Sequence, residues 1–146
     1  MRAALHEAER VCRVRGVRLT EIRKRVLELI WRTHGPVGAY ALLEELGHDG
    51  RPPAPPTVYR ALEFLLEQGL VHRIERLNAF VSCSYPERPH VSQFFICTEC
   101  RSVIELSDET IGAAIADKAL REGFAIRRQI IEIEGLCRDC RKDDHQ

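Results

Sequence analysis

The sequence lacks a long apolar run, a secretion-type leader and a net charge. Its longest apolar stretches are only a handful of residues, whereas a membrane-spanning helix needs about 20. The N-terminus, MRAALHEAER, carries acidic residues early and has no apolar core of the kind that a secretion signal requires. We therefore expect a cytoplasmic protein that does not use a membrane.

The absence of net charge argues weakly against nucleic-acid binding, because backbone phosphates favour clustered cations. The charges are unevenly distributed, however: residues 1–25 hold eight Lys or Arg against three Glu. A local basic patch of this kind is enough for DNA binding. With 146 residues, 45% of them hydrophobic and 30% charged, the chain can fold as one domain or as two small ones.

Six cysteines in a cytoplasmic chain are more typical of metal ligands or redox groups than of structural disulfides. Cys12 lies on an apolar helical face, which indicates a small buried hydrophobe. Two Cys-x-x-Cys pairs remain, and each would place two sulfurs on one tight turn. Together they predict a four-thiolate zinc site that closes a βαβ-type segment of 36 residues, formed by Cys97, Cys100, Cys137 and Cys140.

A redox-active pair, as in a thiol-disulfide enzyme, is the alternative for these cysteines. Such a pair stands at the N-terminus of a helix that follows a strand, where the pKa of one thiol is lowered. A strand does precede Cys97, but the sequence after it returns to strand. The pattern therefore favours structural zinc.

The first half of the chain is typical of short amphipathic helices. We predict a helix to about residue 14, a second that Thr20 caps and that Gly35-Pro36 ends, a third closed by Gly47, and a fourth over residues 57–68. The cations of the second helix are either solvated or in contact with phosphates; they are Arg23, Lys24, Arg25 and Arg32.

Two β-like runs, residues 71–76 and 79–83, follow the fourth helix. Helices followed by a hairpin are the order of a winged helix-turn-helix, whose last helix enters the major groove and reads base edges. The apolar spacing leaves Thr57, Tyr59 and Arg60 outside the core of that helix. We predict a DNA-binding domain over residues 1–83 and a polar hinge over residues 84–90.

Residues 91–146 predict a second, smaller domain, so that the fold class is α+β. Strands are expected over residues 94–96, 103–106 and 125–136, a helix over residues 108–120, and frayed structure over residues 143–146. About 55 residues form only a small core, so a metal ion or dimerisation would supply what this α/β domain lacks.

A second group of possible ligands surrounds the predicted hinge. His72 and Cys83 lie on the hairpin, His90 at the end of the hinge and Glu105 in the second domain. Each alone is unremarkable, but two imidazoles, a thiolate and a carboxylate form a set that zinc accepts in tetrahedral geometry. A metal bound by all four would order the hinge.

Long motifs in the chain resemble the ferric-uptake-regulator superfamily. They are PTVYRAL over residues 56–62, LLEQGLVH over residues 65–72, FICTEC over residues 95–100 and LCRDC over residues 136–140. The resemblance covers the chain from about Val11 to Cys140, and the sequence looks most like the zinc-uptake-regulator branch.

This resemblance implies a zinc-responsive repressor that binds double-stranded operator DNA as a homodimer and controls zinc-uptake genes, with no enzymatic activity and no small-molecule substrate. It implies two Zn²⁺ per subunit, one structural and one regulatory. The structural ion would be bound by the four paired cysteines, and the regulatory ion by His72, Cys83, His90 and Glu105. Tyr59 and Arg60 would read bases, Arg60 suiting a guanine edge, and Tyr40 on the preceding helix would be a further DNA contact.

The sequence departs from the family pattern at two places. The Thr-Pro-Gln-Arg that often opens the second helix is Thr20-Glu21-Ile22-Arg23, and Ser92 stands where a further metal ligand would be. Three other functions stay open: an iron- or peroxide-responsive member of the same family, a thiol-disulfide enzyme, and a DNA-binding protein with structural zinc alone. Cys83 discriminates within the family, because a soft sulfur ligand favours zinc.

Overall fold

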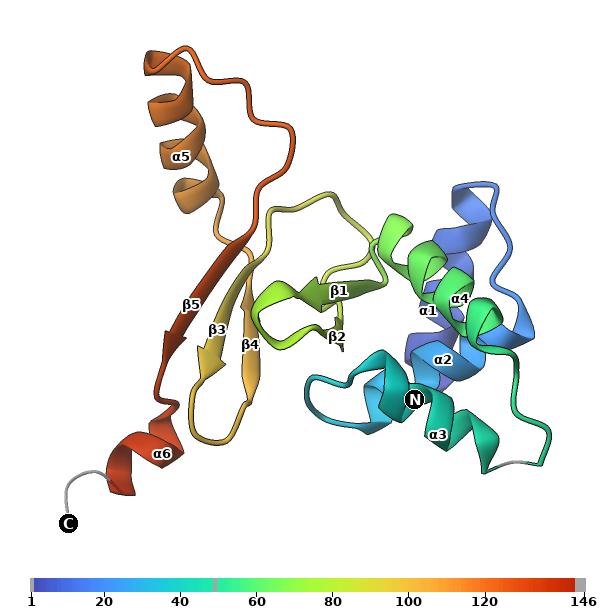
Figure 1. The fold of residues 1–146 in the computed structure, drawn as a ribbon. Helices are drawn as coiled ribbons and strands as arrows, with labels where there is room; N and C mark the ends of the chain where they lie inside the picture. Colours follow the sequence, from blue (N-terminus) through green and yellow to red (C-terminus); the bar gives the residue numbers. More distant parts are fainter. Residues whose placement is uncertain (1, 49, 144–146) are drawn as a thin grey trace. The chain divides into compact units, whose positions relative to one another are not determined.

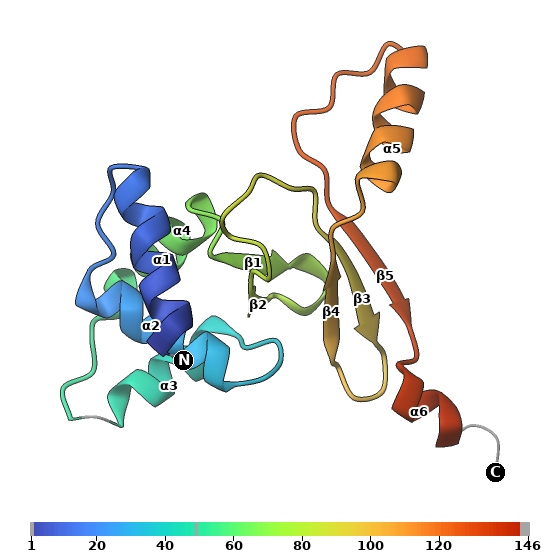
Figure 2. The ribbon, with the colours of Figure 1, turned by 180° about the vertical axis from the view of Figure 1, so that it is seen from behind.

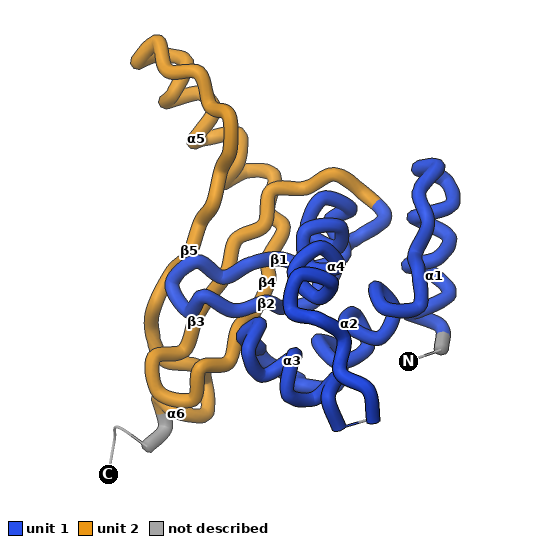
Figure 3. Tube along the Cα trace, turned by 45° about the vertical axis from the view of Figure 1, so that its right-hand side comes forward, with its two compact units in different colours: residues 1–87 blue, residues 88–146 orange. Residues whose placement is uncertain are grey.

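A computed structural model describes residues 2–48 and 50–143. The chain separates into two compact units, Met1–Glu87 and Arg88–Gln146 (Figure 3). The boundary falls inside the segment predicted to be a hinge. Residues 144–146, which we expected to be frayed, lie outside the described residues. Among the described helices, none has the length and apolar character needed to cross a membrane.

The first unit contains four helices and a hairpin (Figure 1). Its elements are α1 (Arg2–Val14), α2 (Glu21–Arg32), α3 (Ala39–Gly47), α4 (Pro55–Glu67), β1 (Val71–Ile74) and β2 (Ala79–Ser82). Helix α1 ends at Val14 as predicted, and Gly16, with φ of +70°, follows it. Pro55 and Pro56 occupy the first turn of α4, where proline's fixed φ suits the helix and no amide donor is lost.

The core of the first unit is formed by the inner faces of its helices. Cys12 is 1% exposed and burial raises its pKa, which confirms that it behaves as a small hydrophobe. Thr20 does occupy the N-cap position of α2, but its side chain makes no capping hydrogen bond. Among the fully buried side chains are Val26, Leu27, Leu42, Leu46, Val58, Leu62 and Leu65.

The hairpin strands are shorter than the sequence predicts. They pair antiparallel from Val71 opposite Ser82 to Ile74 opposite Ala79. Beyond Ile74 the chain forms a 3-10 turn, Glu75–Leu77, and then Asn78 adopts a positive φ of +46°. This tight turn uses residues that would otherwise extend β1. Helices followed by a short hairpin are nevertheless the predicted order of a winged helix-turn-helix.

The second unit is built on a three-stranded sheet of order β4-β3-β5. Its elements are β3 (Gln93–Cys97), β4 (Val103–Leu106), α5 (Glu109–Arg121), β5 (Ile131–Gly135) and α6 (Arg138–Asp143). The central strand β3 pairs antiparallel with β4 and parallel with β5. Asp108 caps α5, because its carboxylate accepts from the backbone amides of Thr110 and Ile111. The α+β class is confirmed.

In the second unit the predicted extent of the last strand was wrong, and one helix was missed. The last strand begins at Ile131 and not at Ala125, because the five residues of β3 find their parallel partners in Ile131–Gly135 alone. The short helix α6 was not predicted. In both views α5 extends beyond one end of the sheet (Figures 1 and 2), and no residue of this helix is buried.

Two of the four basic side chains on α2 contact other residues of the first unit. The Arg23 guanidinium lies 3.6 Å from the centroid of the Phe64 ring, and its Nη1 donates to the Arg18 carbonyl at 2.6 Å. Lys24 Nζ lies 2.6 Å from a carboxylate oxygen of Glu9. Arg23 and Lys24 therefore connect α2 to neighbouring segments, which is neither of the two roles that the sequence suggested for them.

Replacing Arg23 should destabilise the first unit. We expect Arg23→Ala to lower the free energy of unfolding by about 1–2 kcal/mol, because a cation–π contact and a charged hydrogen bond are both lost. Urea denaturation followed by the fluorescence of Trp31, the one tryptophan in the chain, measures this. Arg18→Ala keeps the accepting carbonyl and should change little; an equal loss in both variants would contradict the assignment.

Candidate metal centres and nucleic-acid interface

The pairing of β3 with β5 brings the two Cys-x-x-Cys pairs together. Cys97 is the last residue of β3 and lies opposite Gly135 at the end of β5. Cys100 lies in the turn between β3 and β4, Cys137 directly precedes α6, and Cys140 lies within α6. The chain between the two pairs thus forms β4, α5 and β5 and then returns to the end of β3.

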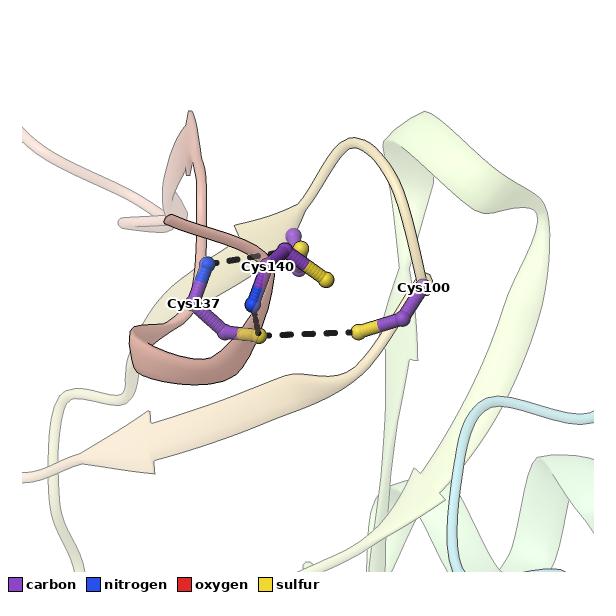
Figure 4. Close-up of side chains that lie close together, drawn as sticks. Cys100, Cys137 and Cys140 are labelled. Atoms are coloured by element: carbon purple, nitrogen blue, oxygen red, sulfur yellow. Dashed lines mark hydrogen bonds between the residues drawn. The ribbon is translucent and has the colours of Figure 1, made fainter. Parts of the chain in front are cut away.

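The four sulfurs have the spacing of a tetrahedral zinc site. They all lie within 4.8 Å of one another, and those of Cys100 and Cys137 are 3.7 Å apart (Figure 4). Zn–S bonds of about 2.3 Å in tetrahedral geometry require sulfurs about 3.8 Å apart. The Thr98 amide donates to the Gly135 carbonyl at 2.9 Å, which ties the two turns together. The donor set and its geometry therefore fit zinc.

Backbone amides around the cluster favour thiolates. The Cys137 amide donates to Cys97 Sγ at 3.4 Å, and chiefly this contact lowers the pKa of Cys97 to about 6. The Cys140 amide donates to Cys137 Sγ at 3.5 Å and lowers the pKa of that thiol. The hydrogen bond from the Cys140 thiol to Cys137 raises the pKa of Cys140 to about 12. The surroundings thus lower the pKa of Cys97 and Cys137 and raise that of Cys140.

The redox alternative requires a thiol at the start of a helix. Cys137 does meet that requirement, since it follows β5 and precedes α6. Its sulfur, however, belongs to the four-sulfur cluster. Four sulfurs at tetrahedral spacing are typical of metal binding, whereas a disulfide enzyme needs two. The geometry therefore favours the metal site.

His72 and Cys83 lie on one face of the hairpin. His72 is opposite Val81, and the Cys83 amide donates to the Leu70 carbonyl at 3.0 Å. Side chains two residues apart on a strand share a face, so His72 and Cys83 are diagonal neighbours. A ring nitrogen of His72 and the sulfur of Cys83 lie within 4.8 Å. The hairpin of the first unit therefore presents an imidazole and a thiol side by side.

His90 and Glu105 form a polar pair within the second unit. Nε2 of His90 lies 3.0 Å from Glu105 Oε1, and the Ser92 hydroxyl donates to the same oxygen at 2.8 Å. The side chains of His90 and Glu105 are 8% and 4% exposed. The other ring nitrogen of His90, Nδ1, lies 2.9 Å from the Arg88 carbonyl.

This arrangement suits a cation between the two side chains. If Nδ1 donates to the Arg88 carbonyl, Nε2 carries a lone pair that faces the carboxylate oxygen. Two acceptors at 3.0 Å need a shared proton or a metal ion. Metal-bound histidines commonly donate their second ring N–H to a carbonyl in this way. The Ser92 contact was missed from the sequence, which suggested only that Ser92 replaced a ligand.

The residues predicted to read DNA lie on exposed helical surface. Thr57, Tyr59 and Arg60 are exposed near the start of α4, whose other side buries Val58. Tyr40, in the first turn of α3, is 75% exposed, an unusual position for a large aromatic ring. The structure thus presents these polar and aromatic side chains to solvent. Their contacts with DNA stay a prediction.

Comparison with known proteins agrees with these features. The model of the ferric uptake regulator family matches residues 14–134. The zinc uptake regulation protein of Escherichia coli (strain K12) is 44% identical over 137 residues, which are 93% of this chain and 80% of that protein. The chain belongs to the ferric uptake regulator family. The resemblance to its zinc-uptake-regulator branch is confirmed as well.

Solved structures of this family match the whole fold. A zinc uptake regulator complexed with zinc and DNA has a TM-score of 0.93 at 41% identity, covering 99% of this chain and 97% of that one. The holo form of the protein XcZur has a TM-score of 0.91 at 41% identity, covering 97% and 99%. The apo form of XcZur, covering 96% and 97%, has a TM-score of only 0.55.

Zinc binding to the cysteine cluster should release protons. At pH 7 the thiol of Cys140, with a pKa of about 12, is protonated, whereas that of Cys97, at about 6, is mostly thiolate. Zinc binds thiolates, so at least the Cys140 proton leaves, and affinity rises with pH. Below about pH 6 Cys97 is protonated as well, and affinity falls further.

Calorimetry at pH 7 in buffers of different ionisation heat counts the protons released. Cys140→Ser is the matched variant, because it removes the thiol that holds its proton most firmly. We expect at least one proton per zinc in the wild type and fewer in the variant. Binding without proton release would contradict the assignment of Cys140 as a ligand.

Proposed function

We propose that this family member is a zinc-responsive transcriptional repressor which binds operator DNA as a zinc-loaded homodimer and controls zinc uptake. The observation that carries the proposal is the pairing of a thiol, Cys83, with an imidazole, His72, on the hairpin. Sulfur in a sensing site favours zinc over iron. The similarity to zinc uptake regulators supports the same conclusion. The protein would act in the cytoplasm and perform no catalysis.

One zinc ion per subunit would be structural. Cys97, Cys100, Cys137 and Cys140 would hold it. The second unit is small, and its helix α5 has no buried residue. A zinc ion at the end of the sheet would link the β3–β4 turn to α6 and so supply stability that apolar packing does not. This site would stay loaded while the zinc supply varies.

A second zinc ion would be regulatory. His72, Cys83, His90 and Glu105 would bind it. Two of these residues precede the predicted hinge in the chain, His90 is its last residue and Glu105 follows it. A metal bound to all four would restrict the hinge and select the conformation that binds DNA. The two forms of XcZur support this idea: their TM-scores against this chain, 0.91 and 0.55, mean that metal state accompanies a large structural difference in that protein.

The exposed start of α4 would read the operator. An arginine at this position, Arg60, can donate two hydrogen bonds to the major-groove edge of guanine. Thr57 and Tyr59 would contact neighbouring bases or phosphates, and Tyr40 would reach the DNA from α3. In a homodimer the two α4 helices would read half-sites about one helical turn apart.

The exposed apolar face of the second unit supports a homodimer. Strand pairing places Phe95 beside Ile104 on one side and Ile133 on the other. These three side chains are 43%, 52% and 46% exposed, although they form one apolar stripe across the sheet. An apolar stripe of this kind marks an interface. A second copy of the chain would bury it.

The iron- or peroxide-sensing alternative makes a different prediction for Cys83. A sensor that uses nitrogen and oxygen ligands would tolerate loss of the thiol. A sensor built on this thiol would lose zinc affinity, because serine oxygen is a far poorer zinc ligand than thiolate sulfur.

Replacing Cys83 should shift the zinc response to much higher free zinc without unfolding the protein. We expect Cys83→Ser to need at least about 100-fold more free zinc for operator binding than the wild type does, since losing a ligand costs more than the 10–100-fold of an outer-shell change. Fluorescence anisotropy of labelled operator DNA in zinc buffers measures it.

Cys12→Ser is the matched control, because Cys12 is buried in the core of the first unit and belongs to neither proposed ligand group. It should lower stability and leave the zinc midpoint unchanged. A wild-type zinc midpoint in Cys83→Ser would contradict the sensor. DNA binding that ignores zinc in every variant would leave a DNA-binding protein with structural zinc alone.

A charge on the apolar stripe should split the dimer. We expect Ile104→Glu to raise the dimer dissociation constant at least about 100-fold, because it replaces an apolar side chain that the dimer would bury with an unpaired carboxylate. Light scattering coupled to size-exclusion chromatography measures the mass. Val14→Glu, at an apolar position 76% exposed on α1, is the control. A dimeric Ile104→Glu protein would place the interface elsewhere.

A further inference from the structure

The antiparallel pairing of β3 with β4 ends at Gln93, the first residue of β3. Its last pair is Gln93 opposite Leu106. With the same register, the next hydrogen-bonding level would set Val91 opposite Asp108. The backbones are not paired there. Instead, the side chain of Gln93 lies between them.

The side-chain amide of Gln93 makes the hydrogen bonds that the two backbones do not make with each other at this point. Its Nε2 donates to the carbonyls of Val91 at 3.0 Å and Asp108 at 3.2 Å. Its Oε1 accepts from the Asp108 amide at 3.0 Å. The orientation of the side chain is fixed by these partners, because only the NH₂ group can donate to two carbonyls and only the oxygen can accept. The residue is 1% exposed, so each of these contacts satisfies a group without water.

Both members of the polar pair lie next to this amide in the chain. His90 directly precedes Val91, whose carbonyl Gln93 binds, and Glu105 precedes Leu106, which is Gln93's strand partner. Ser92, which directly precedes Gln93, donates its hydroxyl hydrogen to the Glu105 carboxylate. The Gln93 side chain therefore ties the backbone directly after His90 to the backbone at Asp108, three residues after Glu105.

The same amide binds the residue that caps α5. Gln93 contacts both the N–H and the C=O of Asp108. The Asp108 carboxylate in turn accepts from the amides of Thr110 at 2.8 Å and Ile111 at 3.4 Å. A continuous set of hydrogen bonds therefore leads from the backbone beside His90 to the first turn of the helix.

We infer that Gln93 is a positioning residue for zinc held by His90 and Glu105, and that it connects occupancy of this pair to the N-terminus of α5. The inference rests on the proposed function. Gln93 does not touch the metal. It fixes the backbones that carry two ligands, and when a ligand pair is already held in place, binding costs less ordering.

Two substitutions test the role of the amide. Gln93→Met keeps the length and burial of the side chain but removes every hydrogen bond. Gln93→Glu keeps an acceptor for the Asp108 amide but places a carboxylate opposite two carbonyl oxygens. For both we expect the second zinc equivalent to bind 10–100-fold more weakly than in the wild type, the range typical of outer-shell partners. The first equivalent should bind as before.

Thr98→Val is the matched control. The Thr98 hydroxyl donates to the Gly135 carbonyl at 3.3 Å, so it also joins β3 to a neighbouring strand, but at the cysteine end. This variant should leave the second equivalent unchanged. Competition with a chromophoric chelator, followed by a count of zinc per subunit, resolves the two equivalents in each protein.

Amide hydrogen exchange on the wild type tests the connection to α5 without a substitution. The second zinc equivalent should slow exchange at Asp108, Thr110 and Ile111 several-fold. The Arg101 amide, which donates to the Cys97 carbonyl at 3.0 Å, should respond to the first equivalent only. This measurement still decides the question if the Gln93 variants do not fold.

The outcomes separate this inference from the proposed function. A wild type that binds one equivalent only, with zinc-independent DNA binding, would refute the proposed function. A normal wild type with unchanged second-equivalent affinity in both Gln93 variants would overturn the inference alone. If the Gln93 variants bind both zinc equivalents equally more weakly, Gln93 only stabilises the core and the inference is overturned. Hydrogen exchange at Asp108 that does not change with zinc would overturn the inference as well.

Discussion

The hydrogen-bond pairing of β3 is the interaction on which the second unit depends. Parallel pairing with β5 sets Cys97 opposite Gly135 and thereby brings the two cysteine pairs within tetrahedral spacing. Antiparallel pairing with β4 sets Phe94 opposite Glu105 and ends at Gln93. One five-residue strand therefore positions four sulfurs at its end and a buried His–Glu pair near its start. A slip of one residue would disrupt both, because it moves every side chain to the other face.

The second unit leaves much of its apolar surface uncovered. No residue of α5 is buried, and Phe95, Ile104 and Ile133 stay exposed on the sheet. A small domain with so little core needs further stabilisation. The proposed structural zinc would cross-link it, and a second subunit would bury its exposed apolar surface. The structural metal and the dimer would thus make up for the same small core.

Much of this arrangement could be predicted from the sequence. Amphipathic spacing and Gly–Pro punctuation gave the four N-terminal helices, and the Cys-x-x-Cys spacing predicted a cluster that the structure does assemble. The extent of the last strand could not be predicted, because the sequence does not reveal that β3 offers pairing partners only to Ile131–Gly135 and none to the residues from Ala125 onward. The role of Gln93 was missed as well. The one available signal was a polar residue at the head of the apolar run QFFIC.

In the proposed mechanism, occupancy of a second metal site, and not of the cysteine cluster, controls DNA binding. Zinc content and operator binding measured on the same wild-type samples, across buffered free zinc, test it most directly. We expect zinc content to rise from one to two ions per subunit as free zinc increases, and operator binding to rise only as the second ion binds. Full operator binding with a single zinc per subunit would contradict it.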